Sequence, residues 1–275
     1  KRNDVMYALV DDNLVASWNF AAALAGIEEA ASAALEPHDE RLAPNAFQVV
    51  LAASLAYEHR LGAASRFAAY IRTLPSNVST IGWYWTPEEV ACTVEGPAFG
   101  PKEMQDTLVT FHTVFAEVQM AVPALVEITP IEAEWAYLMV KTRSFDFPDT
   151  GSAILPLFDA VNHNPRRGVG PFLTRIPSAD GHKRVKVYAV ATRDHAPGDE
   201  VLASYGELSP FRMAWQYGFV DRSASIVVDS PSIGAIYKTG NHTKDAPACT
   251  VMPQAFYGEA EGGRRVQRID AVLPA

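Results

Sequence analysis

The chain has 275 residues, of which 48% are hydrophobic and 20% are charged, so it can build a sizeable core and is not disordered by composition. Its net charge of −9 argues against a nucleic-acid partner, because phosphate binding needs clustered Lys and Arg. No apolar run approaches the roughly 18 residues that a membrane span needs. The two cysteines, Cys92 and Cys249, form no disulfide framework and favour a reducing, intracellular compartment.

The first half of the chain has the pattern of helices. Asp12 or Asn13 can cap an Ala-rich helix, and Asn45 can cap a second helix that Gly62 ends. Pro87, followed by two glutamates, predicts the first turn of another helix. In chain order, the segments expected to be helical are 13–35, 46–61, 65–75, 102–122 and 130–145.

After Phe145 the composition changes, because glycine and proline become frequent and the apolar runs become short. Such runs between turn residues predict strands. The expected strands are 154–158, 184–192, 200–205 and 225–229, with a turn at 195–199. The lone Gly-Val-Gly at 168–170 predicts a loop. A helical half followed by a strand-rich half indicates an α+β chain.

Most familiar catalytic and metal-binding patterns are missing. The seven histidines show no HxxxH or HExxH spacing and the cysteines form no CxxC, so no zinc site is predicted. There is no GxSxG nucleophile motif and no P-loop. The pair Glu88-Glu89 fits a solvated helix start better than acid–base catalysis.

Two segments, 159–163 (DAVNH) and 198–220, are more informative together than apart. Taken alone, Asn162-His163 before a proline fits a helix C-terminus with a satisfied histidine. Taken alone, Tyr205 fits an ordinary strand tyrosine. The order of polar and aromatic residues across both segments nevertheless follows a known pattern.

In that order the chain resembles the SET-domain protein methyltransferases, in the branch of Rubisco large-subunit lysine methyltransferase and the actin histidine methyltransferase. The family carries D-x-x-N-H, then G-[DE]-E, a strand ending Y-G, and a helix leading to [YS]-G-F. The matching residues are Asp159, Asn162-His163, Gly198-Asp199-Glu200, Tyr205-Gly206, Ser209 and Tyr217-Gly218-Phe219. Upstream, the segment 55–75 resembles the helical insert of the family, with its E-x-x-x-G-x-x-S and Y-[IL]-x-x-L-P patterns.

The resemblance implies an α+β SET domain of short curved sheets with a pseudoknot, formed by 1–14 and 130–222. It implies a helical insert at 15–129 and leaves 223–275 as an extension of unassigned fold. It also implies S-adenosylmethionine as the cofactor and no metal. The implied site comprises the cofactor-binding residues Arg143, Asp159, Asn162 and His163, and the catalytic residues Tyr205 and Tyr217.

The sequence departs from the family at both ends. About 55 residues follow Val220, and they do not have the pattern of the helical substrate-binding domain of many relatives. The G-x-G strand expected before the turn at Asn3-Asp4 is absent, and the chain begins at Lys1, which predicts a processed, trimmed or incomplete sequence. Two functions therefore remain open. One is a protein methyltransferase acting on a lysine, or a histidine, of a non-histone protein. The other is an inactive SET-like subunit that binds partners in a larger assembly.

Overall fold

The structure is a computed structural model and describes residues 5–10, 14–17, 19–40, 43–77, 81–86, 101–147, 151–164, 169–177, 183–206, 208, 210–220 and 267–268. The chain divides into two compact units. Unit 1 comprises 1–77 and 109–205, and unit 2 comprises 78–108 and 206–275. The predicted helical turn at Pro87, the strand at 225–229 and Ser209 lie outside the described residues.

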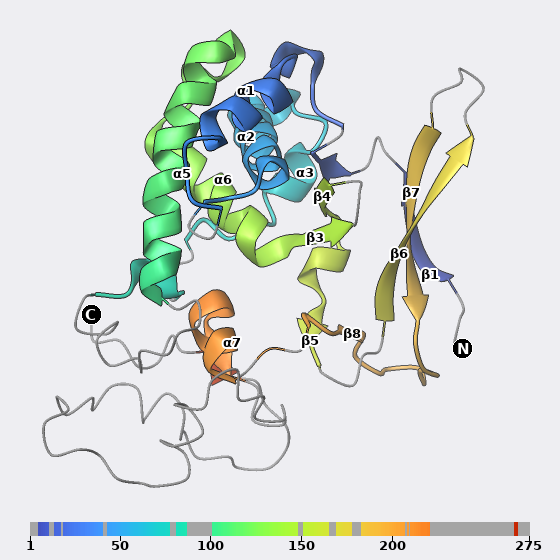
Figure 1. Cartoon of the computed structure of the whole chain (residues 1–275). Helices are drawn as coiled ribbons and strands as arrows, with labels where there is room; N and C mark the ends of the chain where they lie inside the picture. Colours follow the sequence, from blue (N-terminus) through green and yellow to red (C-terminus); the bar gives the residue numbers. More distant parts are fainter. Residues whose placement is uncertain are drawn as a thin grey trace, which may run out of the picture. The chain divides into compact units, whose positions relative to one another are not determined.

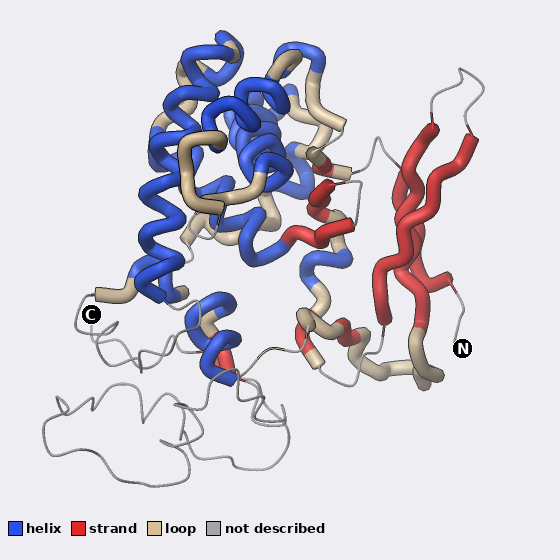
Figure 2. The backbone as a smooth tube through the Cα atoms, in the orientation of Figure 1, coloured by secondary structure: helices blue, strands red, loops and turns tan. Residues whose placement is uncertain are grey.

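Helices and strands occupy the following positions (Figures 1 and 2). The helices are η2 (Ala22–Leu24), α1 (Ile27–Leu35), α2 (Ala46–Leu61), η3 (Gly62–Ala64), α3 (Ala68–Ile71), η4 (Gly82–Tyr84), α5 (Pro101–Ala121), η5 (Pro123–Leu125), α6 (Pro130–Arg143), η6 (Phe158–Ala160) and α7 (Pro210–Tyr217). The strands are β1 (Val5–Val10), β2 (Val15–Ala16), β3 (Ser144–Phe147), β4 (Gly151–Ile154), β5 (Asn162–His163), β6 (Val169–Pro177), β7 (Lys183–Ala191), β8 (Leu202–Ala203), β9 (Phe219–Val220) and β10 (Gln267–Arg268).

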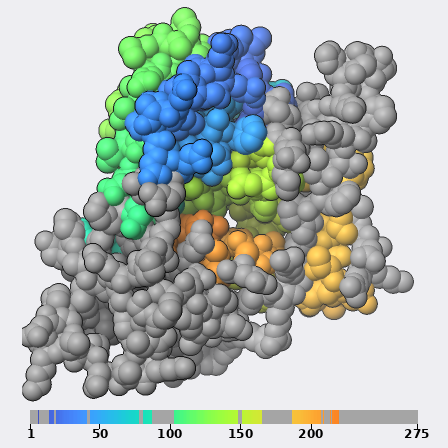
Figure 3. Space-filling model, in the orientation of Figure 1, coloured from blue at the N-terminus to red at the C-terminus, as the bar shows by residue number. Residues whose placement is uncertain are grey.

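Helix α2 is the centre of the helical part of unit 1. The Asn45 side chain caps it by accepting a hydrogen bond from the Gln48 amide at 2.8 Å, and Gly62 ends it with a positive φ of 55°. Its residues are buried on nearly every side, because α1 and α6 pack against it. In the space-filling view, the blue atoms of the N-terminal helical part adjoin green atoms from the region after residue 100 (Figure 3).

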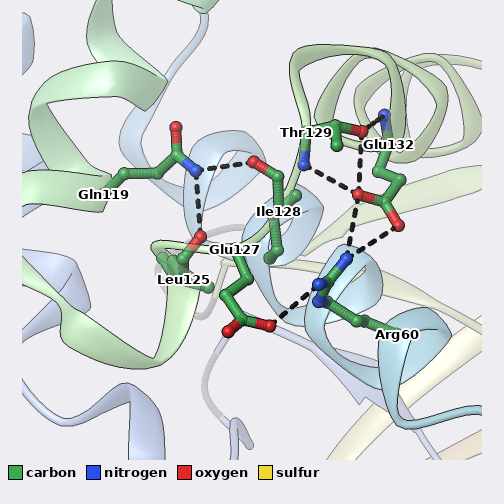
Figure 4. Close-up of polar contacts among 7 residues, drawn as sticks. All are labelled: Arg60, Gln119, Leu125, Glu127, Ile128, Thr129 and Glu132. Atoms are coloured by element: carbon green, nitrogen blue, oxygen red, sulfur yellow. Dashed lines mark hydrogen bonds and ion pairs between the residues drawn. The ribbon is translucent and has the colours of Figure 1, made fainter.

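Polar contacts fix the turn between α5 and α6 (Figure 4). Thr129 and Glu132 form a reciprocal capping box at the start of α6. From α2, Arg60 contacts Glu132 at 3.4 Å and Glu127 at 2.8 Å. From α5, the Gln119 amide donates to the carbonyls of Leu125 and Ile128. These contacts hold α6 in place, and α6 ends at a predicted site residue.

Unit 1 also contains two sheets. The smaller has the order β2-β4-β3, and the larger has the order β1-β7-β6-β8-β5. One buried cluster joins them, because apolar residues of the small sheet pack with those of β7 and β8. Its members are Leu14, Ala16, Ala153, Leu155, Phe158, Val187, Ala189 and Ala203. The α+β architecture predicted from the sequence is confirmed.

Unit 2 contains η4, the first turns of α5, and α7 with the short β9–β10 pair. The Gln105 amide donates to the backbone carbonyls of Gly82 and Trp85. Gly82 lies so close to Trp215 of α7 that a Cβ on it would meet the Trp215 Cβ at 2.8 Å. Glycine at position 82 therefore allows η4 and α7 to pack.

Several expected boundaries are wrong, and tertiary pairing explains them. Residues 13–35 do not form one helix, since β2 pairs with β4 and Gly26, with φ of 82°, precedes α1. The helix expected to reach residue 145 ends at Arg143, because β3 then pairs with β4. The helix expected over 65–75 shortens to α3.

Two further corrections concern the strand-rich part. The strand expected at 154–158 is wrong beyond Ile154, where β4 ends, because Pro156 lacks an N–H and Leu157 has a φ of 74° in the turn that follows. The loop predicted at 168–170 is wrong for Val169 and Gly170, which begin β6 and pair with β7 along the whole strand. The predicted strand at 184–192 and the turn at 195–199 are confirmed.

Candidate functional site

Arg143 and Asp159 meet because of the register of the small sheet. Arg143 is the last residue of α6, and the next residue, Ser144, pairs with Ile154 across the β3–β4 ladder. The turn after β4 then leads into η6, where the Asp159 amide donates to the Leu155 carbonyl at 3.0 Å. The chain thus returns to the end of α6, and Arg143 Nη1 lies 3.1 Å from Asp159 Oδ2.

The Asp159 carboxylate is buried, with only 2% of its side chain exposed, whereas the Arg143 side chain is 25% exposed. Oδ2 also accepts a 2.7 Å hydrogen bond from the hydroxyl of Tyr70, which lies on α3. Burial raises the pKa of Asp159, although the Tyr70 hydrogen bond and the Arg143 charge lower it. Oδ1 is also buried and has no hydrogen-bond partner among the described residues. The site therefore holds a buried acceptor beside a partly exposed cation.

The segment that follows Asp159 pairs with a distant part of the chain. β5 runs parallel to β8, with Asn162 opposite Leu202 and His163 opposite Ala203. Tyr205 follows two residues after β8 ends. The Tyr205 amide donates to His163 Nδ1 at 3.0 Å, and the two rings lie 5.1 Å apart. Because Nδ1 accepts this bond, a neutral His163 carries its proton on Nε2.

Tyr205 also connects the two groups of residues. Its hydroxyl donates to the Val161 carbonyl at 2.8 Å, between Asp159 and Asn162 in the chain. Burial raises the pKa of Tyr205, the nearby Arg143 charge lowers it and the Asp159 charge raises it. Tyr205 is therefore a neutral phenol at neutral pH, within range of both charged groups.

Asn162 is exposed, unlike its neighbour His163. Its amide Nδ2 donates to Glu200 Oε1 at 2.8 Å. Glu200 follows a tight turn in which the Ala196 amide donates to Asp199 Oδ2 and Gly198 has a φ of 90°. The G-D-E motif thus places Glu200 opposite Asn162.

The structure brings five of the six predicted site residues together in unit 1, namely Arg143, Asp159, Asn162, His163 and Tyr205. Tyr217 lies at the end of α7 in unit 2, where its ring is 6.0 Å from that of Phe219. Its role beside Tyr205 stays a prediction. Tyr70 was not predicted as a site residue, although it is the tyrosine of the Y-[IL]-x-x-L-P pattern in the insert.

The residues that the structure describes form neither a metal-binding group nor a membrane-spanning helix. These residues contain no group of three or more His, Cys, Asp or Glu side chains arranged to hold a metal ion. No helix among them combines the length and apolar character that crossing a membrane requires.

Comparisons with known proteins identify the fold. No protein-family model matches the chain, and no curated protein does. The SET domain of LSMT bound to lysine and AdoHcy matches with a TM-score of 0.57 and 16% identity, over 80% of this chain and 48% of that one. Rubisco LSMT bound to AdoMet matches with a TM-score of 0.54 and 16% identity, over 81% of this chain and 48% of that one.

The chain thus spans about half the length of the solved structures that it matches. At this level of identity the likeness concerns the fold, and it agrees with the motif order of the sequence. The chain has the fold of a SET domain.

Proposed function

We propose that this chain is an S-adenosylmethionine-dependent protein methyltransferase that acts on a lysine, or alternatively a histidine, of a non-histone protein. The observation that carries the proposal is the convergence of Arg143, Asp159 and Tyr205 in unit 1. The SET-domain fold supports it, because the structures of that fold described above are bound to AdoMet or AdoHcy and, in one case, to lysine.

The charges of the site fit the amino-acid end of the proposed cofactor. That end carries a carboxylate and an ammonium group. Among the described residues, Arg143 uses only Nη1 in hydrogen bonds, to Asp159, so its other N–H groups remain for the carboxylate. The unsatisfied Oδ1 of Asp159 is a suitable acceptor for the ammonium group. Asn162 and the backbone of β5 would hold the rest of the cofactor.

The same residues suit methyl transfer. Bound S-adenosylmethionine would supply an electrophilic methyl group, and the reaction then needs alignment of the acceptor nitrogen more than acid–base groups. The Tyr205 hydroxyl, held in place by Val161, can orient the methyl through C–H···O contacts worth about 0.5–1 kcal/mol each. We assign Tyr205 to this role, and Tyr217 to the channel for the target side chain.

Calorimetry tests the cofactor assignment. We expect the protein to bind S-adenosylhomocysteine with a Kd on the order of 1–100 μM, with 1 μM corresponding to about −8 kcal/mol. Adenosine, which lacks the amino-acid end, is the matched control ligand and should bind much more weakly. Equal affinity for both ligands would contradict the roles of Arg143 and Asp159.

Product analysis tests the target residue. Proteins labelled from methyl-tritiated S-adenosylmethionine are hydrolysed, and the labelled amino acid is identified by chromatography. We expect methyllysine, and methylhistidine would assign the other target. Cofactor binding without any labelled product would favour the inactive SET-like subunit instead.

A further inference from the structure

Tyr70 connects the helical part of unit 1 to the proposed cofactor site. It lies on α3, in the segment that resembles the family's insert, and its contact with Asp159 spans 89 residues of sequence. The hydroxyl donates to Oδ2, the same oxygen that accepts from Arg143. The Asp159 carboxylate therefore connects the Tyr70 hydroxyl to the Arg143 guanidinium group.

We propose that Tyr70 is a positioning residue that keeps the Asp159 carboxylate ionised and correctly oriented, so that Arg143 can receive the carboxylate of an amino-acid ligand. The inference rests on the proposed cofactor site and adds a residue to it. Tyr70 does not touch the ligand in this proposal. It acts on the ligand through Asp159 and Arg143.

The surroundings of Asp159 explain why the hydroxyl matters. A carboxylate with 2% exposure has lost nearly all hydration, so its charge depends on the donors around it. Three groups from different elements act on it: Tyr70 from α3 donates a hydrogen bond, Arg143 from α6 supplies a positive charge, and Tyr205 after β8 is a neutral phenol. Only the first two stabilise the anion.

The prediction concerns pH. Burial already raises the pKa of Asp159, and loss of the Tyr70 hydrogen bond raises it further. Because the ionised form is the one that orients Arg143, affinity should fall as the pH drops through the pKa of Asp159. In Tyr70→Phe this fall in affinity should occur at higher pH, because the hydrogen bond that favours the ionised carboxyl is lost.

The experiment measures the Kd of S-adenosylhomocysteine by calorimetry between about pH 5 and pH 8 for the full chain and its variants. The matched control is Tyr57→Phe on α2, because Tyr57 is half-buried and makes no hydrogen bond through its hydroxyl to another described residue. We expect the Kd of the control to change with pH as it does in the wild type. At the acid end of the range, Tyr70→Phe should bind S-adenosylhomocysteine about tenfold more weakly than the wild type.

The outcomes separate the inference from the proposed function. Absence of binding by the wild-type protein would overturn both. Wild-type binding with an unshifted curve for Tyr70→Phe would overturn the role of Tyr70 alone. If Tyr70→Phe fails to fold, Asp159→Asn tests the titration on which the role of Tyr70 depends, because an asparagine side chain does not titrate. The inference requires that the affinity of Asp159→Asn for S-adenosylhomocysteine no longer decreases as the pH is lowered. A decrease like that of the wild type would contradict the inference.

Discussion

The helical part of unit 1 and the corner where β5 meets β8 are held together in different ways. The helices α2 and α6 bury side chains along most of their length and begin at side-chain caps. At the corner, two-residue strands pair, and side-chain contacts from Asn162, His163 and Tyr205 support them. Burial of apolar surface is distributed over many residues, whereas each polar contact depends on one atom pair.

This difference predicts how the two regions respond to mutation. A change in the helices away from Tyr70 and Arg143 should lower stability while the site of the remaining folded molecules stays intact. A change at the corner should alter ligand binding with a smaller effect on folding. Arg143 belongs to both regions, because it ends α6 and pairs with Asp159. The four predictions below test this division, from the largest expected effect to the smallest.

Leu138→Ala tests the helical region. Leu138 lies on α6 and is fully buried, so removing its side chain leaves a cavity and should cost about 2–5 kcal/mol of unfolding free energy. Urea denaturation measures the loss. The affinity of the folded protein for S-adenosylhomocysteine should match that of the wild type. A parallel loss of affinity below the unfolding transition would contradict the division between the two regions.

Arg143→Ala should affect both properties. Its loss leaves the buried Asp159 carboxylate without its cation, which should lower the free energy of unfolding by about 3 kcal/mol near neutral pH. Ligand binding should also weaken. Because the pKa of Asp159 then lies further above its unfolded value, the anion destabilises the fold at neutral pH. This destabilisation should shrink as the pH falls toward that pKa.

Arg60→Ala is the matched control for Arg143→Ala. Arg60 also pairs with carboxylates across unit 1, but it does so at the surface, where solvent screens the pairs (Figure 4). We expect a smaller loss of stability and unchanged ligand binding. An equal loss of stability in Arg60→Ala and Arg143→Ala would mean that the burial of Asp159 does not determine how much stability is lost.

Asn162→Ala tests the corner alone. Asn162 is exposed and contributes little to packing, so stability should remain near that of the wild type. The Kd for S-adenosylhomocysteine should rise at least about tenfold, which is about 1.4 kcal/mol. Glu200→Gln keeps an acceptor for the Asn162 amide and serves as the control. Equal weakening by Glu200→Gln, which keeps the contact, would contradict the assignment of the effect to Asn162 itself.

Local signals explain which parts of the fold the sequence could predict. Asn45 and Gly62 bound α2 as expected, because caps act within a few residues. The stretch after Asn13 has the composition of a helix, but Val15 and Ala16 pair with β4 across the sequence. A pairing partner so far away leaves no trace in local composition. Val169 and Gly170 were missed for the same reason, since β7 supplies their partners.

The candidate site was predictable to the extent that its motifs are contiguous. The D-x-x-N-H and Y-G segments identified Asp159, Asn162, His163 and Tyr205, and the structure joins them through β5 and β8. Tyr70 belongs to a motif of the helical insert, and only the fold shows that its hydroxyl ends at Asp159. Contacts between motifs, unlike the motifs themselves, depend on the path of the chain.

The smallest expected effect comes from Tyr137→Phe on α6. The Tyr137 ring stacks on Phe111 with centroids 4.2 Å apart, and this stacking survives the substitution. Its hydroxyl is buried without a hydrogen-bond partner among the described residues, and burial raises its pKa. Removing a buried polar group that lacks a partner should leave stability unchanged or raise it by up to about 1 kcal/mol.

Thermal unfolding with and without S-adenosylhomocysteine measures the effect of Tyr137→Phe. A loss of about 1 kcal/mol would show that an ordered water satisfies the hydroxyl, since deleting a satisfied group carries a cost of that size. In that case the helical region, too, would depend on a single polar contact, and the contrast with the β5–β8 corner would weaken. An unchanged or higher stability, with unchanged ligand binding, means that apolar burial alone holds α6 at this position.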